Sequence, residues 1–326
     1  MGNIEIRALF IGILRIDRTN GQPLAVVYNF ACHLLFGDAQ GSVTANFVGV
    51  ASRVIESTLG HGATALFLQG AAGDVMNVLF KDFHRPRDVE PLGNILAVST
   101  LSALRKIKTG DAALSLITET IKLPRRTDIP EKIRDLEQEQ TKLLESLRFM
   151  TLDFKTFLPM YIQYAINSGY PADFSFRYLQ AERLGSDAFA AMDTLNKSNI
   201  EKYMANIRSM ENLARIQDKI ATLQRHQAIN DESGDKTVDA EIQGIRIGEC
   251  VLITSTTEVL TEVALNIKNA SPHKHTFVVA LTNGYIHYGP PEADYDKGGY
   301  EVTECFLSPG WQQLYQDRVH DIIERL

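Results

Sequence analysis

The sequence has few cysteines, and none of them stands in a paired motif. Three cysteines occur in 326 residues, at positions 32, 250 and 305. A disulfide scaffold is typically built from an even set of cysteines, and a cysteine-based zinc site from C-x-x-C pairs. The cysteine pattern therefore argues against a disulfide scaffold and against a cysteine-based zinc site.

Long hydrophobic runs are lacking as well. The longest uncharged stretch, residues 156–172, is interrupted by proline, glycine and polar residues, whereas a membrane span needs about 20 consecutive apolar residues. Near the N-terminus, Glu5 and Arg7 come before any apolar region could form, which is not the order of a signal peptide. We therefore expect no transmembrane segment and no signal peptide in this chain, and the sequence leaves its cellular location open.

An excess of positive charge is also missing. Lysine and arginine together number 33 against 40 aspartates and glutamates, which leaves a formal net charge of -7. Nucleic-acid binding depends on a basic surface, so nucleic acid is not expected as the main partner. A hydrophobic content of 44% over this length fits one large globular domain or two smaller ones.

What the sequence does contain is an alternation of strand and helix patterns, broken by a long helical segment. Short apolar runs and helical periodicities fill the first 124 residues and resume near residue 236, whereas residues 128–227 carry near-heptad spacing. We predict an α/β fold, a mixed β-sheet core layered with helices. Its domain is discontinuous, residues 1–127 and 236–326, with a long helical hairpin, residues 128–235, inserted as an arm. Such an arm offers a surface through which two copies could form a homo-oligomer.

The boundaries predicted for the individual elements follow from these patterns. An Asn-Gly pair at Asn20-Gly21, between two apolar runs, indicates a β-hairpin. The predicted strands cover residues 8–16, 24–32, 63–69, 112–123, 238–247, 250–254 and 276–281, and the predicted helices outside the arm cover residues 47–59, 89–106, 258–267 and 311–323.

Aromatic residues gather between the two long helices of the arm. Nine of them lie between positions 149 and 178, among them Phe154 and Phe157. One interpretation is that they form the arm's own core, and the other is that they make an apolar cover over a site for a greasy substrate.

Reactive side chains stand at four places where a predicted strand ends, which is where α/β folds usually build their sites. They are His33, Asp74, Glu258 and the group Tyr285, His287 and Tyr288. Each has a structural explanation as well. A histidine at a strand end is often a hydrogen-bonded core residue, a Gly-Ala-rich segment is often a tight turn, and a glutamate in a first helical turn is favoured by the helix dipole. The functional explanation is a metal site with oxyanion-stabilising phenols.

Taken together and in order, these segments resemble a known family. N-F-A-C-H, L-F-L-Q-G-A-A-G-D, T-E-V-L and T-N-G-Y-I-H-Y-G-P-P-x-x-x-Y-x-x-G-G-Y-E are similar to motifs in the catalytic domain of the neutral/alkaline non-lysosomal ceramidases. The similarity is greater to bacterial relatives of unassigned substrate. The resemblance covers residues 11–77 and 242–323.

The resemblance implies a zinc-dependent hydrolase in which a metal-activated water attacks an N-acyl amide, with a lipid-like amide as substrate. It implies that His33, Glu258 and Tyr288 are zinc ligands and that Tyr300 stabilises the oxyanion. Asp74 is expected to assist by orienting a neighbouring group. We further predict that the substrate is contacted by Tyr285, His287, Phe154 and Phe157.

Two departures from the family leave an alternative open. The family's other zinc histidine lies in an upstream T-H-T-H-S-G-P-like segment that is missing here, so the chain resembles an N-terminally shortened member. Met76 stands where ceramidases carry a serine. The alternative is a non-catalytic or incomplete member that acts as a binding or scaffold protein. Relatives of this family are often exported, but this chain gives no sign of its own location.

Overall fold

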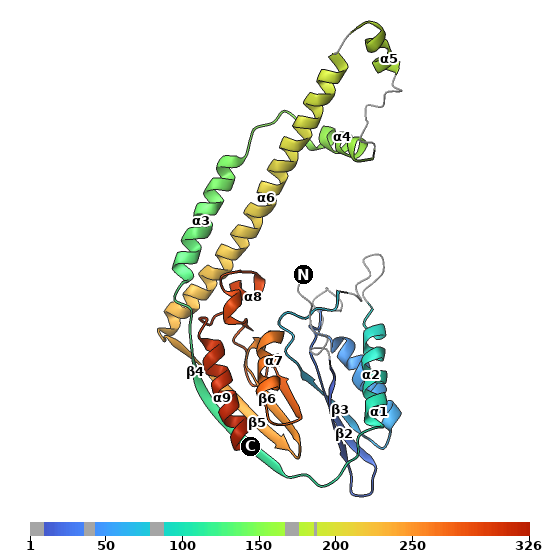
Figure 1. The fold of residues 1–326 in the computed structure, drawn as a ribbon, viewed down its shortest axis with the longest axis vertical. Helices are drawn as coiled ribbons and strands as arrows, with labels where there is room; N and C mark the ends of the chain where they lie inside the picture. The colour runs from blue at the N-terminus through green and yellow to red at the C-terminus, as the bar shows by residue number, and fades with distance from the viewer. Residues whose placement is uncertain (1–9, 36–42, 79–87, 167–175, 186–187) are drawn as a thin grey trace. The chain divides into compact units, whose positions relative to one another are not determined.

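The computed structural model describes residues 10–35, 43–78, 88–166, 176–185 and 188–326 (Figure 1). The chain divides into two compact units. The first consists of residues 1–127 and 229–326, and the second of residues 128–228. The first unit contains the sheets and the second is helical, and the predicted α/β fold class is confirmed.

One sheet of the first unit has the strand order β1-β2-β3. β1 and β2 form the antiparallel hairpin expected at Asn20-Gly21, where Gly21 adopts a φ of 81°, and β2 pairs with β3 in parallel. Buried residues of α1 and α2 pack against these strands in one hydrophobic core. The bounds are β1 (Gly12–Asp17), β2 (Pro23–Phe30), α1 (Asn46–Leu59), β3 (Thr64–Gln69) and α2 (Glu90–Leu104).

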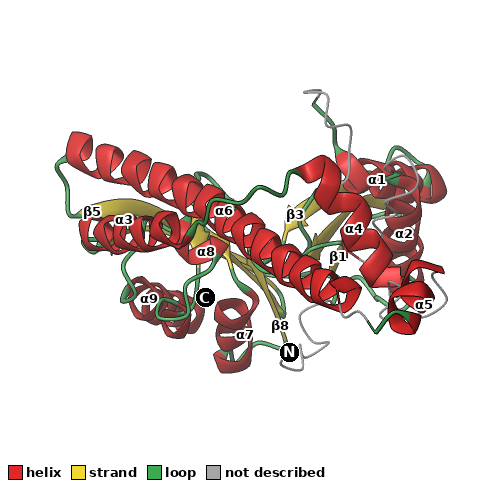
Figure 2. Ribbon diagram, turned by 90° about the horizontal axis from the view of Figure 1, so that it is seen from above, coloured by secondary structure: helices red, strands yellow, loops and turns green. Residues whose placement is uncertain are grey.

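The other large sheet has the order β4-β5-β6-β8, with β6 and β8 parallel and the remaining pairs antiparallel. Helices α7 and α9 lie together on one side of it (Figure 2). Their apolar faces, including Trp311 and Tyr315, close a second core. The bounds are β4 (Leu114–Pro124), β5 (Thr237–Ile247), β6 (Cys250–Thr254), α7 (Thr261–Ala270), β8 (His275–Val279) and α9 (Trp311–Arg325).

The two sheets meet where parallel strands end. The Ala280 N–H donates to the Gln69 carbonyl (2.9 Å), so the end of β8 adjoins the end of β3. Buried Asn29 links the sheets, because its amide donates to carbonyls of Leu68 (3.1 Å) and Val278 (3.2 Å). The loops that follow β2, β3, β6 and β8 therefore leave from one region of the unit, which is the usual place for a site in this fold class.

Two very short strands and two short helical segments complete the first unit. The strands are parallel and join segments far apart in the sequence. The bounds are β7 (Glu258–Val259), β9 (Tyr288–Gly289), the 3-10 segment η3 (Glu292–Asp294) and α8 (Tyr300–Thr303). Glu258 differs from the expectation that it opens a helix. The Glu258 backbone N–H donates a hydrogen bond to the His287 carbonyl (2.9 Å), and α7 begins only at Thr261.

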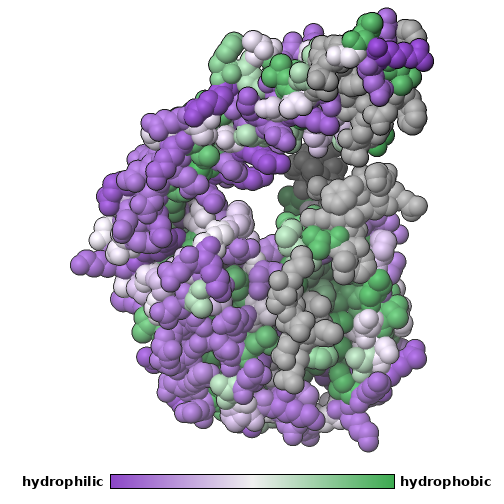
Figure 3. Space-filling view, turned by 45° about the horizontal axis from the view of Figure 1, so that its top comes forward, coloured by the Kyte–Doolittle hydropathy of each residue, from purple (hydrophilic) through white to green (hydrophobic). Residues whose placement is uncertain are grey.

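The second unit consists of helices. α3 and α6 run antiparallel side by side (Figure 1), since Gln140 bonds to Gln217 (2.9 Å) and Ser146 to Ser209 (3.2 Å). The bounds are α3 (Ile129–Ser146), α4 (Phe154–Ile166), α5 (Phe176–Arg183) and α6 (Ala188–Ser233). The face of the molecule shown in Figure 3 carries more hydrophilic than apolar surface, and apolar patches lie between the hydrophilic residues. Within the described ranges, no helix combines the length and apolar character that crossing a membrane requires.

Candidate active site

His33 is held at the end of β2 by the loop that follows β3. Its backbone N–H donates to the Val75 carbonyl (2.9 Å), and its ring Nδ1 lies 3.2 Å from the same oxygen. Because a carbonyl can only accept, this contact favours a proton on Nδ1. The ring is thereby oriented with Nε2 toward the side chains that follow.

Glu258 and Tyr288 are brought together by the pairing of β7 with β9, in which they are direct partners. The His33 Nε2 atom lies 3.1 Å from Glu258 Oε2 and 3.1 Å from the Tyr288 hydroxyl. The side chains of His33 and Glu258 keep 17% and 16% of their surface exposed. The structure therefore places these three sequence-predicted residues in one cluster that is largely buried but still reachable.

Two further tyrosines border this cluster. The Tyr285 hydroxyl donates to the second carboxylate oxygen, Glu258 Oε1 (2.8 Å). Tyr300 stands edge-on to Tyr288, with ring centroids 5.6 Å apart at 74°, and is 63% exposed. Tyr285 thus orients the carboxylate, and Tyr300 lies at the solvent side of the cluster.

The electrostatics of the cluster follow from burial and from these hydrogen bonds. The hydrogen bond with Glu258 raises the pKa of His33 above 6.5, against burial, which lowers it. Burial by itself raises the pKa of Glu258, but hydrogen bonds from His33 and Tyr285 outweigh it and hold that pKa below 4.5. Burial and the adjacent carboxylate raise the pKa values of Tyr285 and Tyr288. The arrangement favours a charged His33–Glu258 pair beside two neutral phenols.

The small-residue loop after β3 forms one wall of the site. The Gly73 N–H donates to the Val259 carbonyl (3.0 Å). Asp74 Oδ1 accepts from both the N–H and the hydroxyl of Thr261 (2.8 and 2.7 Å). Asp74 is therefore placed at the start of α7, where it fixes the loop to that helix. The cavity beside the cluster has a volume of about 210 Å³ and is lined by His33, Leu34, Gln69, Gly70, Ala72, Gly73, Glu258, Ala280 and Leu281.

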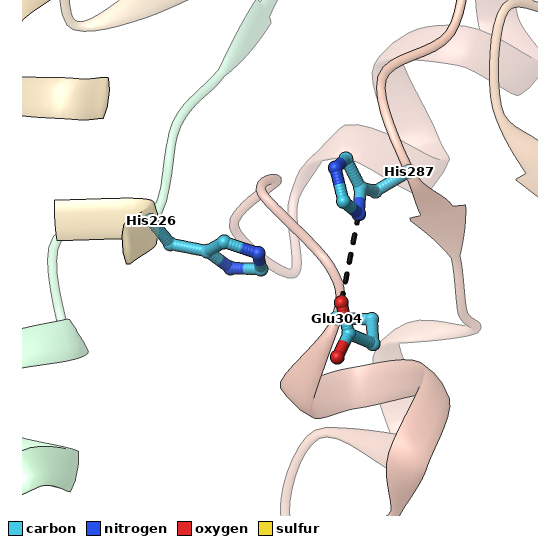
Figure 4. A group of neighbouring side chains, drawn as sticks. All are labelled: His226, His287 and Glu304. Carbon is cyan, nitrogen blue, oxygen red and sulfur yellow. Dashed lines mark ion pairs between the residues drawn. The ribbon is translucent and has the colours of Figure 1, made fainter. Parts of the chain in front are cut away.

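His287 extends toward a different set of side chains. Its Nδ1 lies 3.7 Å from Glu304 Oε2 (Figure 4). Its ring also meets Phe306 edge-on, with ring centroids 4.5 Å apart. Burial lowers the pKa of His287, whereas Glu304 opposes that effect. Figure 4 also draws His226, a residue of α6 in the helical unit. The pairing with Glu304 was not expected, since no spacing rule links a strand-end histidine to a glutamate seventeen positions later.

The other predicted substrate contacts lie in the helical unit. Phe157 is buried there and stacks on Tyr203 (4.3 Å) and Tyr161 (5.5 Å), whereas Phe154 is 58% exposed. Phe157 is thus packed among aromatic side chains of its own unit, and its role as a substrate contact stays a prediction. Of the other aromatics in that stretch, Tyr170 and Phe174 lie outside the described residues.

The donor types in the cluster are compatible with a metal ion. An imidazole nitrogen, a carboxylate oxygen and a phenol oxygen are all atoms that bind divalent cations, and histidine with carboxylate is a common combination for zinc. A ligating histidine usually contacts a carbonyl through its other ring nitrogen, as His33 does with Val75.

Comparison with known proteins identifies a fold relationship. No protein-family model matches the chain, and no curated protein matches it significantly. Among solved structures, it is similar to the neutral ceramidase from Pseudomonas aeruginosa, with 16% identity and a TM-score of 0.54 over 97% of this chain and 47% of that one. It is also similar to a ceramidase complexed with C2, with 14% identity and a TM-score of 0.55 over 100% of this chain and 50% of that one. The chain spans about half the length of these structures, and the likeness shows a ceramidase-like fold.

Proposed function

We propose that this protein is a zinc-dependent hydrolase that cleaves an N-acyl amide bond. The observation that carries the proposal is the convergence of His33, Glu258 and Tyr288, with the imidazole Nε2 3.1 Å from an oxygen of each of the other two. The ceramidase-like fold supports the same class of reaction.

The spacing of the donor atoms fits the proposed ion. Ligands at 2.0–2.2 Å from a tetrahedral zinc lie roughly 3.3 Å from one another. The two donor-atom separations of 3.1 Å need only a small adjustment to reach that value. Three protein ligands with one open position are also the usual arrangement of a catalytic zinc.

Each residue then has a definite task. Zinc at this position would supply Lewis acidity and lower the pKa of a coordinated water to about 7. His33 would hold the ion through an unprotonated Nε2, while the proton on Nδ1 stays hydrogen-bonded to the Val75 carbonyl. Glu258 contributes a negative charge, and the hydrogen bond from the Tyr285 hydroxyl orients its carboxylate. Tyr300, exposed beside Tyr288, would donate a hydrogen bond from its hydroxyl to the amide oxygen as negative charge develops there.

The surroundings of the cavity support an apolar substrate. Leu34 and Leu281, which line the cavity, are 41% and 43% exposed, and Met76 in the adjoining loop is 49% exposed. Apolar side chains left open beside a polar centre are typical of a site for a ligand with a hydrocarbon part. We infer a lipid-like amide. Phe154, exposed in the helical unit, stays a predicted substrate contact, which Phe154→Ala tests by comparing turnover of long-chain and short-chain amides.

Metal analysis of the purified protein tests the proposal. We expect about one zinc per chain in the parent and a large loss in His33→Ala, because a zinc site that loses a ligand loses most of its affinity. Glu258→Gln keeps the shape of the side chain but removes its charge, and should lose both zinc and amide hydrolysis. His61→Asn is the matched control, since His61 is exposed and has a positive φ that asparagine tolerates.

A second candidate function is a binding or scaffold protein without a metal. It is favoured by one observation, namely that His33, Glu258 and Tyr288 satisfy one another's hydrogen bonds directly. A zinc content below about 0.1 per chain, unchanged by His33→Ala, would favour this candidate. An intact zinc site binds zinc tightly enough to be filled in most chains of the purified protein.

A further inference from the structure

A second and larger cavity lies in the first unit, away from the candidate active site. It has a volume of about 940 Å³, which falls in the range of sites for small organic ligands. Its walls come from β1, β2, α2, the end of α7 and β8, and α7 adjoins β8 (Figure 2). It shares no lining residue with the 210 Å³ cavity beside His33. The two cavities are therefore separate sites.

The charged side chains that the structure describes along this cavity are all of one sign. Its described ionisable lining residues are Lys106, Lys268, Lys274 and His275, with no aspartate or glutamate among them. This is unexpected in a chain whose acidic residues outnumber the basic ones, with a net charge of -7. Three ammonium groups around one cavity give it a positive potential that attracts an anion.

Lys268 carries most of this argument. It stands in the last turn of α7 and is half-buried, and its burial lowers the pKa of the ammonium group. Among the described residues, no carboxylate lies within ion-pairing distance of Lys268, Lys274 or Lys106, whereas Lys122, Lys197 and Lys297 each have such a partner. Burying an ammonium group without a carboxylate partner costs free energy of folding. A bound anion next to Lys268 would offset that free energy.

The rest of the lining is divided between apolar and hydroxyl groups. The apolar side chains come from β1, α2 and β8, and Ser99 and Ser102 add hydroxyls along α2. The apolar lining residues include Phe10, Ile11, Ile13, Val98, Ile107 and Phe277. A ligand that fills this cavity therefore has an anionic head and an apolar body.

We propose that this cavity binds a phosphate monoester with an apolar body, its phosphoryl group held by Lys268, Lys274 and Lys106. Lysine binds phosphate as a compact point charge, whereas planar carboxylates are more often held by the arginine fork. No arginine is among the described residues that line the cavity. A phosphate monoester also carries about 1.5 to 2 negative charges at pH 7, enough to balance more than one ammonium group. The phosphoryl group could come from a free metabolite or from a lipid headgroup, which share this chemistry.

Isothermal titration of the full chain with n-hexyl phosphate tests the proposal. We expect the double variant Lys268→Met, Lys274→Met to weaken binding about ten- to a hundredfold, since each change removes a charge-assisted hydrogen bond. Methionine keeps the length and apolar character of the stem, and Lys274 is exposed, so the variant should fold. Lys106→Met alone, at another exposed position, provides an independent check with a smaller loss.

Lys122→Met is the matched control, because it removes one positive charge from the same unit at an exposed site on β4. Binding that falls equally in the control and in the cavity variants would overturn the proposal, as would n-hexanol binding as tightly as n-hexyl phosphate. No detectable binding of n-hexyl phosphate would overturn it as well. Zinc content should stay at the parent level in every lysine variant, so failure here is distinguishable from failure of the proposed hydrolase.

Two further ligands distinguish the sources of the phosphoryl group. Inorganic phosphate that binds as tightly as n-hexyl phosphate would overturn the apolar body of the proposed ligand and would leave a site for a free phosphate group. Tighter binding of n-decyl phosphate than of n-hexyl phosphate would assign it to a lipid headgroup with part of its chain. Both results support the anionic site, provided that the lysine variants weaken the binding as they weaken that of n-hexyl phosphate.

Discussion

At the scale of single residues, the cluster around His33 is balanced between a proton and a metal ion. The same ring nitrogen that faces Glu258 and Tyr288 either carries a proton shared with the carboxylate or binds an ion. The Glu258 carboxylate stabilises either positive charge, the proton on His33 or a metal ion. Its effect on the pKa of His33 can be measured without any metal, through the pH dependence of the protein's stability.

The first prediction concerns that pH dependence in the presence of a chelator. The pKa of His33 is raised above 6.5, so its contribution to stability is complete below 6.5 and is lost as pH rises through the raised value. The pKa of Glu258 is lowered below 4.5, so its contribution is complete above 4.5 and is lost as pH falls through the lowered value. The His33–Glu258 pair therefore stabilises the fold most between pH 4.5 and pH 6.5.

Urea unfolding of the parent and of His33→Gln across pH 5 to 9 provides the measurement. We expect the stability difference between the two proteins to be largest near pH 5 to 6 and to shrink at alkaline pH. A difference that stays constant over the whole range would show that the pair does not titrate as described.

The second prediction isolates Tyr285. Its hydroxyl orients Glu258 from the side opposite His33, and the loss of such an orienting contact typically lowers metal affinity by about 10- to 100-fold. Tyr285→Phe should therefore weaken zinc binding by that factor, measured by competition with a chelating dye, while leaving the thermal midpoint nearly unchanged. The residue is 52% exposed, so little packing is lost. Tyr161→Phe, a partly exposed tyrosine of α4, should bind zinc like the parent.

At the scale of elements, the site depends on pieces too short to stand alone. β7 and β9 have two residues each, and their pairing is supported by the Gly73 loop, whose N–H reaches the Val259 carbonyl. A Cβ at Gly73 would lie 2.6 Å from Leu260 Cδ1 and 2.9 Å from the Glu258 carbonyl oxygen. Only glycine lets the loop approach β7 this closely.

The third prediction follows from that close approach. Gly73→Ala should destabilise the protein by about 1–3 kcal/mol, because overpacking moves either Leu260 or the backbone, and should lower zinc affinity because Glu258 shifts with β7. Gly110→Ala is the control, since a Cβ there meets nothing within 4 Å, and surface changes of this kind usually stay within about 0.5 kcal/mol. Equal unfolding midpoints for the two variants would contradict the packing argument.

The longer elements follow from the sequence because their patterns are local. Apolar runs and alternation predict the strands β2, β3 and β5, and helical spacing with a terminal glycine predicts α1. The strand conformation of Glu258 could not be predicted in this way. The residues that follow Glu258 have a helical periodicity, but Glu258 pairs as a strand with Tyr288, which stands thirty positions further on.

At the scale of the whole molecule, the helical segment leaves and re-enters one β-ladder. Pro124 of β4 is the partner of Thr237 in β5, and the Arg125 N–H donates to the Lys236 carbonyl (2.9 Å). The Asn230 side chain donates to the Arg126 carbonyl (3.3 Å). The two ends of the segment are thus close together, as an inserted arm requires.

The fourth prediction tests the discontinuous domain. Replacing residues 128–228 with a short Gly-Ser linker should leave a protein that unfolds in one cooperative transition, because the linker spans only a short gap and costs little closure entropy. Circular dichroism should show a large fall in helix content. The parent with the same linker added between residues 127 and 128 is the control. An insoluble product, or one without a cooperative transition, would show that the units depend on each other. Sedimentation of both proteins also tests whether the arm pairs two copies.

The sequence by itself determined the α/β class, most strand and helix positions, and which strand ends carry reactive side chains, since all of these depend on neighbours within a few positions. Only the tertiary structure decided which of those side chains meet. His33 and Tyr288 stand 255 positions apart, and no local pattern encodes that contact. The tertiary structure also decided that Asp74 fixes α7, that His287 faces Glu304, and that three lysines line one cavity. Each depends on how packed sheets and helices bring distant loops together.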